Sequence, residues 1–138
     1  MQQQVKKSAY GAVGFCMGGR LAVLTAAELG EKIAAAASFY GGNMAPDEQR
    51  LFTPLLDRFA NVHGELLLLY GAEDQSIEPR EHGRIAERLS SLKKAYTLVV
   101  YPTAGHAFAS HGRKQMYQRE PAEDAWRRTF ELFDRSVR

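Results

Sequence analysis

The stretch GFCMGG, residues 14–19, decides the fold of this chain and contains its single cysteine, Cys16. The small and apolar run before it predicts a β-strand over 9–15. After it, apolar residues recur at helical spacing and predict a helix over 17–29. The glycines on either side of Cys16 allow a strand and a helix to pass close to each other. The stretch therefore predicts a strand, a sharp turn at Cys16, and a helix.

Strands and helices alternate along the rest of the chain. Runs of apolar, β-branched and aromatic residues predict strands over 34–40, 65–70 and 96–101. The second run contains four consecutive leucines, which is typical of a strand that is buried on both faces. Strands that alternate with helices favour a parallel sheet with right-handed connections. We therefore expect a single α/β domain over residues 1–138, built on a parallel sheet flanked by helices.

Two prolines mark the expected starts of the remaining helices. Proline fixes a φ angle that suits the first position of a helix, where its missing N–H is not needed. Pro79 and Pro121 both precede residues with helical periodicity. The apolar residues expected to line one face are Ile85, Leu89 and Leu92 in the first helix, and Trp126, Phe130 and Phe133 in the second.

The composition argues against several classes of function. The chain has 18 Lys and Arg residues and 16 Asp and Glu residues, which gives a formal net charge of +2. Its basic residues are scattered along the sequence, so we expect no nucleic-acid partner. No apolar run reaches the roughly 18 residues that cross a bilayer, and residues 1–7 are polar, so we expect a cytoplasmic protein without membrane contact. A single cysteine allows neither an intrachain disulfide nor a zinc site built on thiolates alone. We predict no metal site.

Cys16 is the candidate nucleophile. A residue on a sharp turn from strand to helix is presented above the sheet, in the position that a nucleophile needs. The positive end of the helix dipole would favour thiolate over thiol there. The backbone N–H of Met17 would point toward a developing oxyanion. The alternative is that Cys16 is a small buried hydrophobic residue and that the glycines only permit a tight turn.

An acid and a base follow in the chain order that such a nucleophile requires. Asp74 comes directly after the leucine-rich strand, and His106 comes after the last strand. The carboxyl ends of parallel strands meet at one edge of a sheet, so both side chains would lie near Cys16. Asp74 could instead cap a turn. Glu73 stays open as the acid and His111 as the base.

Four motifs resemble those of the dienelactone hydrolase family, whose members are α/β hydrolases with a Cys-Asp-His triad. The matching sequences are GFCMGGR at 14–20, YG at 40–41, GAED at 71–74 and AGHAF at 104–108. Together they span most of the chain, and the first and the last are fairly specific. The resemblance implies a partial α/β-hydrolase fold.

The resemblance also implies a cofactor-free hydrolase of small esters or lactones. Cys16 would attack the carbonyl carbon and form a thioester, and Asp74 would orient His106. Water activated by His106 would then release the acid, and Met17 would supply one oxyanion donor. The residues that the matching motifs imply at the substrate are Tyr40 and Phe108.

Two departures from the family matter. The arginine that family members acting on dienelactone carry four residues after the histidine is replaced by Ser110, with Arg113 nearby. Family members are also longer, so we expect a fold that lacks its N-terminal strands. The strand from Ala9 to Phe15 would then be an exposed apolar edge that can pair with another chain. We expect a homodimer, or a complex with a missing N-terminal fragment, joined near that edge.

Two other functions compete with hydrolysis. The first is a catalytically inactive α/β module that acts in oligomerisation or ligand binding, because part of the family's pocket lies outside the matching motifs. The second is nucleotide binding. It is less compatible with the sequence, because the glycines at positions 11, 14, 18 and 19 do not form the spacing G-x-G-x-x-G.

Overall fold

Strands and helices alternate along the chain in the order that the sequence predicts. The structure, a computed structural model, describes residues 9–46 and 53–137. Its elements are β1 (Tyr10–Phe15), α1 (Met17–Leu29), η1 (Gly30–Lys32), β2 (Ile33–Phe39), η2 (Leu56–Asn61), β3 (Glu65–Gly71), α2 (Pro79–Ser91), β4 (Tyr96–Tyr101) and α3 (Arg119–Ser136), where η marks a short 3₁₀ helix.

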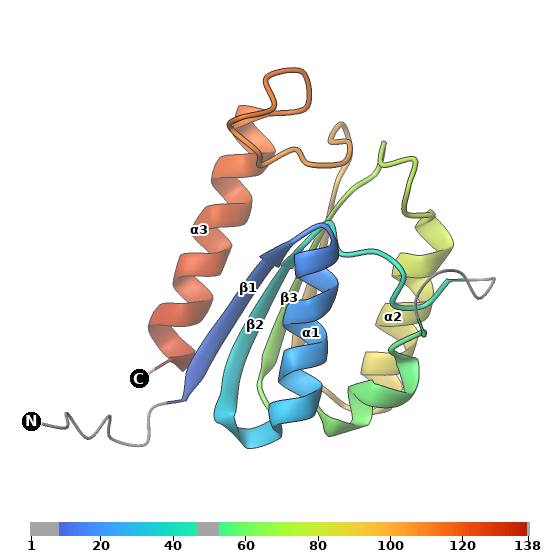
Figure 1. Cartoon of the computed structure of the whole chain (residues 1–138), viewed down its shortest axis with the longest axis vertical. Coiled ribbons are helices and arrows are strands. Elements are labelled where there is room, and N and C mark those ends of the chain that lie inside the picture. Colours follow the sequence, from blue (N-terminus) through green and yellow to red (C-terminus); the bar gives the residue numbers. More distant parts are fainter. Residues whose placement is uncertain (1–8, 47–52, 138) are drawn as a thin grey trace, which may run out of the picture.

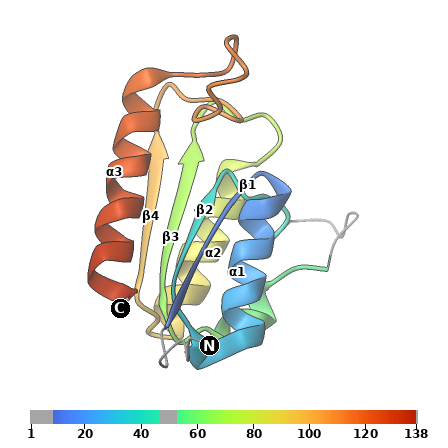
Figure 2. The same cartoon turned by 60° about the vertical axis from the view of Figure 1, so that its left-hand side comes forward.

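The described strands form one parallel sheet in the order β1-β2-β3-β4. Figure 1 shows α1 and α2 on one face of this sheet and α3 on the other. Figure 2, turned about the vertical axis, shows the same three layers. Because all the strands run in one direction, their carboxyl ends lie at the same edge of the sheet. The predicted α/β class is confirmed, and the candidate site residues follow the strands at that edge.

The two middle strands hold much of the core. Every residue of β3 after Glu65 is buried, and β2 is buried except at Ala34. Helices cover both faces of these strands, so apolar side chains are needed at consecutive rather than alternate positions. The run of leucines therefore has the environment that the sequence predicts.

The predicted boundaries hold to within one residue except at the start of the last helix. α3 begins at Arg119, so Pro121 is its third residue rather than its first. Proline is tolerated at this position, because the N–H groups of the first helical turn have no acceptor within the helix. The proline therefore marks the first turn of α3 but not its first residue.

The predicted aromatic face of α3 is not the part of the helix that is most deeply buried. Trp126 and Phe133 are only partly buried, and Phe130 is 59% exposed. Trp126 and Phe130 share a face as predicted, with ring centroids 5.5 Å apart, but small residues let the helix backbone approach the sheet and leave no room beneath it for large rings. The buried positions of α3 are Ala122, Ala125, Thr129 and Leu132.

β1 lies at one end of the sheet and pairs only with β2 among the described strands. Tyr10, Val13 and Phe15 are 54%, 43% and 39% exposed. The exposed apolar edge that the sequence predicts is therefore present in the described residues. Pairing of this edge with a second copy of the chain, or with another fragment, stays a prediction.

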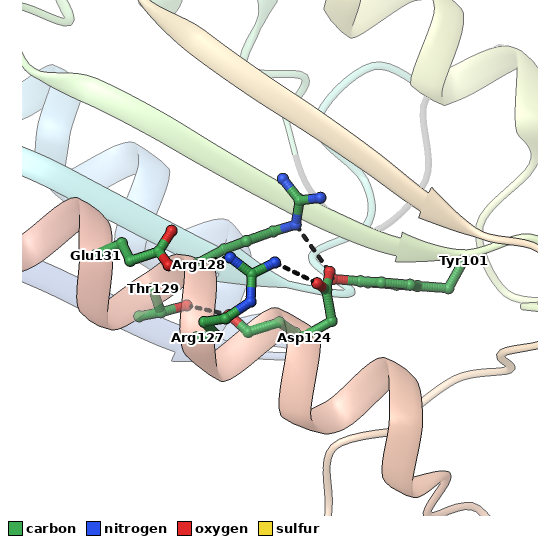
Figure 3. Close-up of polar contacts among 7 residues, drawn as sticks. Tyr101, Asp124, Arg127, Arg128, Thr129 and Glu131 are labelled. Carbon is green, nitrogen blue, oxygen red and sulfur yellow. Dashed lines mark hydrogen bonds and ion pairs between the residues drawn. The ribbon is translucent and has the colours of Figure 1, made fainter.

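A polar cluster ties α3 to the end of β4 (Figure 3). The Tyr101 hydroxyl donates to Oδ2 of Asp124 over 2.7 Å. Arg128 donates to the same oxygen over 2.8 Å, and Arg127 donates to Oδ1 over 2.6 Å. Burial alone would raise the pKa of Asp124, but these hydrogen bonds outweigh it and lower that pKa to about 2. The ionised carboxylate thus holds α3 against the strand that leads to the histidine loop.

Replacing Asp124 by asparagine is expected to lower the free energy of unfolding by about 1 kcal/mol at pH 7, a figure reduced for the 31% exposure of the side chain. Because the pKa in the folded state is depressed, the contribution is complete above the unfolded-state pKa and is lost as the pH falls through the folded-state pKa. The difference between the two proteins should shrink to about half by pH 3. Urea unfolding at both pH values measures it, and an equal difference at both would contradict the assignment.

Candidate active site

Cys16 lies on the turn between β1 and α1 with a φ angle of 55°. This backbone conformation is strained for a residue with a side chain, so the surrounding structure must hold it. The Cys16 N–H donates to the Phe39 carbonyl, and the Cys16 carbonyl accepts from the Gly19 N–H, each over 3.0 Å. A Cβ atom on Gly14 would lie 1.9 Å from the carbonyl oxygen of Gly18. The strand and the helix can therefore cross only because residue 14 is glycine.

The loops after β3 and β4 are joined backbone to backbone. The Ala72 N–H donates to the Tyr101 carbonyl, and the Glu73 N–H donates to the Ala104 carbonyl, each over 2.9 Å. A Cβ atom on Gly71 would lie 2.2 Å from the Ala104 oxygen, so this close approach depends on glycine. The loop that carries the acid and the loop that carries the histidine are thus fixed relative to each other.

Asp74, His106 and Cys16 form a hydrogen-bonded line. Oδ2 of Asp74 lies 2.7 Å from Nδ1 of His106, and Nε2 of His106 lies 3.2 Å from Sγ of Cys16. The Asp74 side chain is fully buried, while the His106 side chain is 32% exposed. Glu73 is exposed, and His111 lies on the wall of the cavity that opens beside Cys16. The structure therefore brings together Asp74 and His106, and leaves Glu73 and His111 outside the line.

Ser76 is a partner of Asp74 that the sequence analysis missed. Its N–H and its hydroxyl both donate to Oδ1 of Asp74, over 2.9 and 2.6 Å. Burial would raise the pKa of Asp74, but the hydrogen bonds from His106 and Ser76 outweigh it and lower that pKa. An aspartate two residues before a serine is typical of a turn in which the carboxylate accepts from the backbone. That spacing is the signal that would have identified Ser76.

The Cys16 thiol is not a ready thiolate. Burial raises its pKa, the charge of Arg113 opposes this rise, and the charge of Asp74 adds to it. The expectation that the helix start favours the thiolate stays a prediction, and in the resting protein burial acts against it. A reaction at Cys16 needs a group that removes the proton, and Nε2 of His106 lies within reach.

The other predicted site residues surround Cys16 in different ways. Met17 is the first residue of α1, so its backbone N–H belongs to the turn whose N–H groups have no acceptor within the helix. Tyr40 lines the cavity beside Cys16, and burial, with the charge of Cys16, raises the pKa of its hydroxyl to about 12. Phe108 is fully buried and packs on Tyr40 and Tyr101, with ring centroids 5.3 and 5.2 Å apart. Phe108 thus supports Tyr40 from the core. It does not face the cavity, although the sequence predicts it at the substrate.

A cavity of about 320 Å³ opens beside Cys16. Ser110 and Arg113 both line it, so the loop after the histidine brings a positive charge to the cavity even though serine stands at the family's arginine position. Sequence spacing alone could not place Arg113, because the path of this loop depends on Ala107, whose φ is 61°. The other residues that line the cavity include Phe15, Tyr40, Ala109 and Trp126.

Within residues 9–46 and 53–137, no three His, Cys, Asp or Glu side chains come together as metal ligands would. In the same part of the chain, no helix is long and apolar enough to cross a membrane.

Comparisons with known proteins bear on this arrangement. The sequence profile of the dienelactone hydrolase family matches residues 1–137. A protein of Methylorubrum extorquens that is assigned as a carboxymethylenebutenolidase is 35% identical over 123 residues, which are 89% of this chain and 42% of the relative. A Synechocystis protein with the same assignment is 30% identical over 97% of this chain and 53% of its own length.

Solved structures give the same picture. A crystal structure from Klebsiella pneumoniae, assigned as a dienelactone hydrolase, has a TM-score of 0.81 and 33% identity over 90% of this chain and 51% of that protein. An esterase from Pyrococcus furiosus, at 18% identity and a TM-score of 0.71, covers 93% of this chain and 54% of its own and shares the fold. The chain thus spans about half the length of the proteins that it matches. The match over residues 1–137 shows that the chain belongs to the dienelactone hydrolase family.

Proposed function

We propose that the chain hydrolyses esters or lactones through a thioester on Cys16, with His106 as the base and Asp74 as its partner. The observation that carries the proposal is the line from Oδ2 of Asp74 to Sγ of Cys16, with steps of 2.7 and 3.2 Å. Such contacts between a nucleophile, a base and an orienting group are typical of covalent catalysis. The relatives that are assigned as carboxymethylenebutenolidases extend the proposal to lactones, which are cyclic esters.

In the first half of the reaction, Nε2 of His106 removes the Cys16 proton while the sulfur attacks the carbonyl carbon. The C–S bond forms, the carbonyl electrons move onto oxygen, and the Met17 N–H donates to that oxygen. As the intermediate collapses, the C–O bond to the alcohol breaks and His106 gives its proton to the leaving oxygen. The products of this half are a thioester and an alcohol, which stay joined when the substrate is a lactone.

In the second half, water attacks the thioester. His106 takes a proton from the water as its oxygen bonds to the acyl carbon, and the C–S bond then breaks. The sulfur takes that proton from His106, so the thiol is restored and a carboxylic acid leaves. Asp74 stays ionised throughout, because its pKa is lowered, and it stabilises the imidazolium in both halves.

Tyr40 and Arg113 give the cavity beside Cys16 a polar side. The raised pKa of the Tyr40 hydroxyl keeps it protonated, so it can donate a hydrogen bond to bound substrate. The charge of Arg113 opposes the effect of burial on Cys16 and so favours the developing thiolate. We therefore assign Tyr40 to substrate contact and Arg113 to stabilisation of the reacting sulfur.

The alternative, an inactive module, is less well supported. Such a module has no need to hold a thiol, an imidazole and a buried carboxylate in contact. A buried carboxylate is costly unless it is paired, and the positive φ angle of Cys16 costs further free energy. Strained and buried polar groups of this kind cluster at functional sites.

The thioester itself provides the test. Mixing the protein with p-nitrophenyl acetate and quenching in acid should add the mass of one acetyl group to the peptide that contains Cys16. Hydroxylamine should remove this group, because it attacks thioesters. The Cys16→Ala variant, treated in the same way, should gain no acetyl group. Turnover without acetylation of Cys16, or acetylation of another residue only, would contradict the proposal.

A further inference from the structure

The cavity beside Cys16 continues into a second groove on the surface of α3. His111 and Trp126 line both the cavity of about 320 Å³ and a neighbouring groove of about 310 Å³. Two shared wall residues make the two spaces neighbours rather than separate sites. The second groove leads from Trp126 toward Phe130, along the side of α3 that is not packed on the sheet.

The walls of this second groove are largely aromatic. The Trp126 and Phe130 rings stack with centroids 5.5 Å apart, and the Trp126 ring lies 5.7 Å from that of Phe15, next to Cys16. His111 and Tyr117 also line the groove, with ring centroids 4.3 Å apart. Rings therefore run without a break from the neighbour of Cys16 to Phe130, which is 59% exposed.

The charged residues of the groove are already paired. Glu123 accepts from Arg119 over 2.8 Å. Arg127 pairs with Asp124 over 2.6 Å and with Glu131 over 3.0 Å, and its contact with Asp124 is drawn in Figure 3. Pairing within the helix leaves the groove without a free charge from these two residues, so apolar contact decides what it binds.

We propose that this groove binds the acyl chain of the substrate, and that the chain therefore acts on esters with an extended apolar acyl group. The inference rests on the proposed function, because it takes Cys16 as the acylated residue. After the first half of the reaction, the acyl group is bonded to the sulfur, so the space that adjoins Cys16 must hold it. A chain longer than that space can continue past Trp126 to Phe130.

The expected effect can be scaled from hydrophobic transfer. Complete burial of one methylene group gives roughly a fourfold gain in binding, and a surface groove covers about half of the chain, so we expect about a twofold gain per methylene. Removing the Phe130 ring should lower kcat/KM about fivefold for an ester with a long acyl chain. It should leave kcat/KM for the acetate ester unchanged, because an acetyl group does not reach the ring.

Turnover of p-nitrophenyl esters with acyl groups from acetate through butyrate and octanoate to decanoate tests the first part. The value of kcat/KM should rise from butyrate to decanoate. The Phe130→Ala variant should reduce this rise by about fivefold and keep the wild-type rate on acetate. Leu29→Ala removes a similarly exposed apolar side chain at the far end of α1 and should keep both. Circular dichroism checks that both variants are folded.

A second measurement does not need turnover. N-methylmaleimide and N-octylmaleimide both add to a thiol, with the sulfur and its proton joining the two carbons of the double bond. The octyl reagent should label Cys16 faster than the methyl reagent, and Phe130→Ala should reduce the difference by about fivefold.

The two measurements separate failure of the groove from failure of the proposed function. A flat chain-length series, together with equal labelling rates, would overturn the acyl groove even if acetate is hydrolysed at Cys16. A Phe130→Ala variant that loses the same factor on acetate and decanoate would also overturn it. Faster octyl labelling without any turnover would keep the groove as an apolar binding site but end its role as an acyl site, because the proposed function would then have failed.

Discussion

The Cys16→Ala and His106→Ala variants are expected to lose at least about 10⁴-fold in kcat/KM for ester hydrolysis. Cys16→Ala removes the atom that forms the thioester. His106→Ala removes the group that takes the proton from a thiol whose pKa burial has raised. The double variant should be no slower than either single variant, because the two side chains act as one unit. Initial rates of p-nitrophenol release measure all three.

His63→Ala is the matched control for the histidine variant. His63 is exposed and precedes β3, at the end of the sheet opposite to the candidate site. This variant should keep the wild-type rate. If His106→Ala kept most of the wild-type activity, or if the two single losses multiplied in the double variant, the proposed roles of Cys16 and His106 would be wrong.

The Gly14→Ala variant is expected to lose about 3 kcal/mol of stability or more, because a Cβ atom there would lie 1.9 Å from the Gly18 carbonyl oxygen. That atom is backbone and cannot move away as a flexible side chain would. Relief requires β1 and α1 to separate, and this would also displace Cys16. Urea unfolding measures the loss, and the rate of ester hydrolysis should fall with it.

Gly18→Ala is a control only four residues away. A Cβ atom on Gly18 meets no heavy atom within 4 Å, and the residue lies in the first turn of α1. Alanine is the better helix former, so this variant should be as stable as the wild type or slightly more stable. Equal stability of the two variants would show that the turn can relax around a side chain at residue 14.

The sequence predicts much of the fold because its signals are local. The glycines around Cys16 predict a turn at that point of the chain, and the leucines of β3 predict a buried strand. The observed strands match the prediction. Periodicity identifies the apolar stripe of α3 but not which part of it fits under the helix, so it could not predict the exposure of Phe130. On α3 the small residues pack on the sheet, and the large rings lie to one side. That choice depends on the space between layers, which no local pattern encodes.

The candidate site also combines features that local sequence signals predict with features that they do not. Chain order and strand ends are enough to select Asp74 and His106, because parallel strands present their carboxyl ends at one edge. Chain order and strand ends do not predict the position of Arg113, because it reaches the cavity through an irregular loop with a positive φ angle at Ala107. They do not predict the raised pKa of Cys16 either, since the extent of burial follows from packing in three dimensions.

The position of Cys16 at the end of the most exposed strand has a consequence for how the site fails. β1 exposes four of its six residues, whereas the acid and base follow strands whose loops are bound to each other. Local opening starts where few apolar groups are buried, so we expect warming to fray β1 before it loosens β3 from β4. The Asp74–His106 pair would then stay together while the sulfur moves out of its reach. We therefore expect the site to stop working at a lower temperature than the one that melts the whole domain.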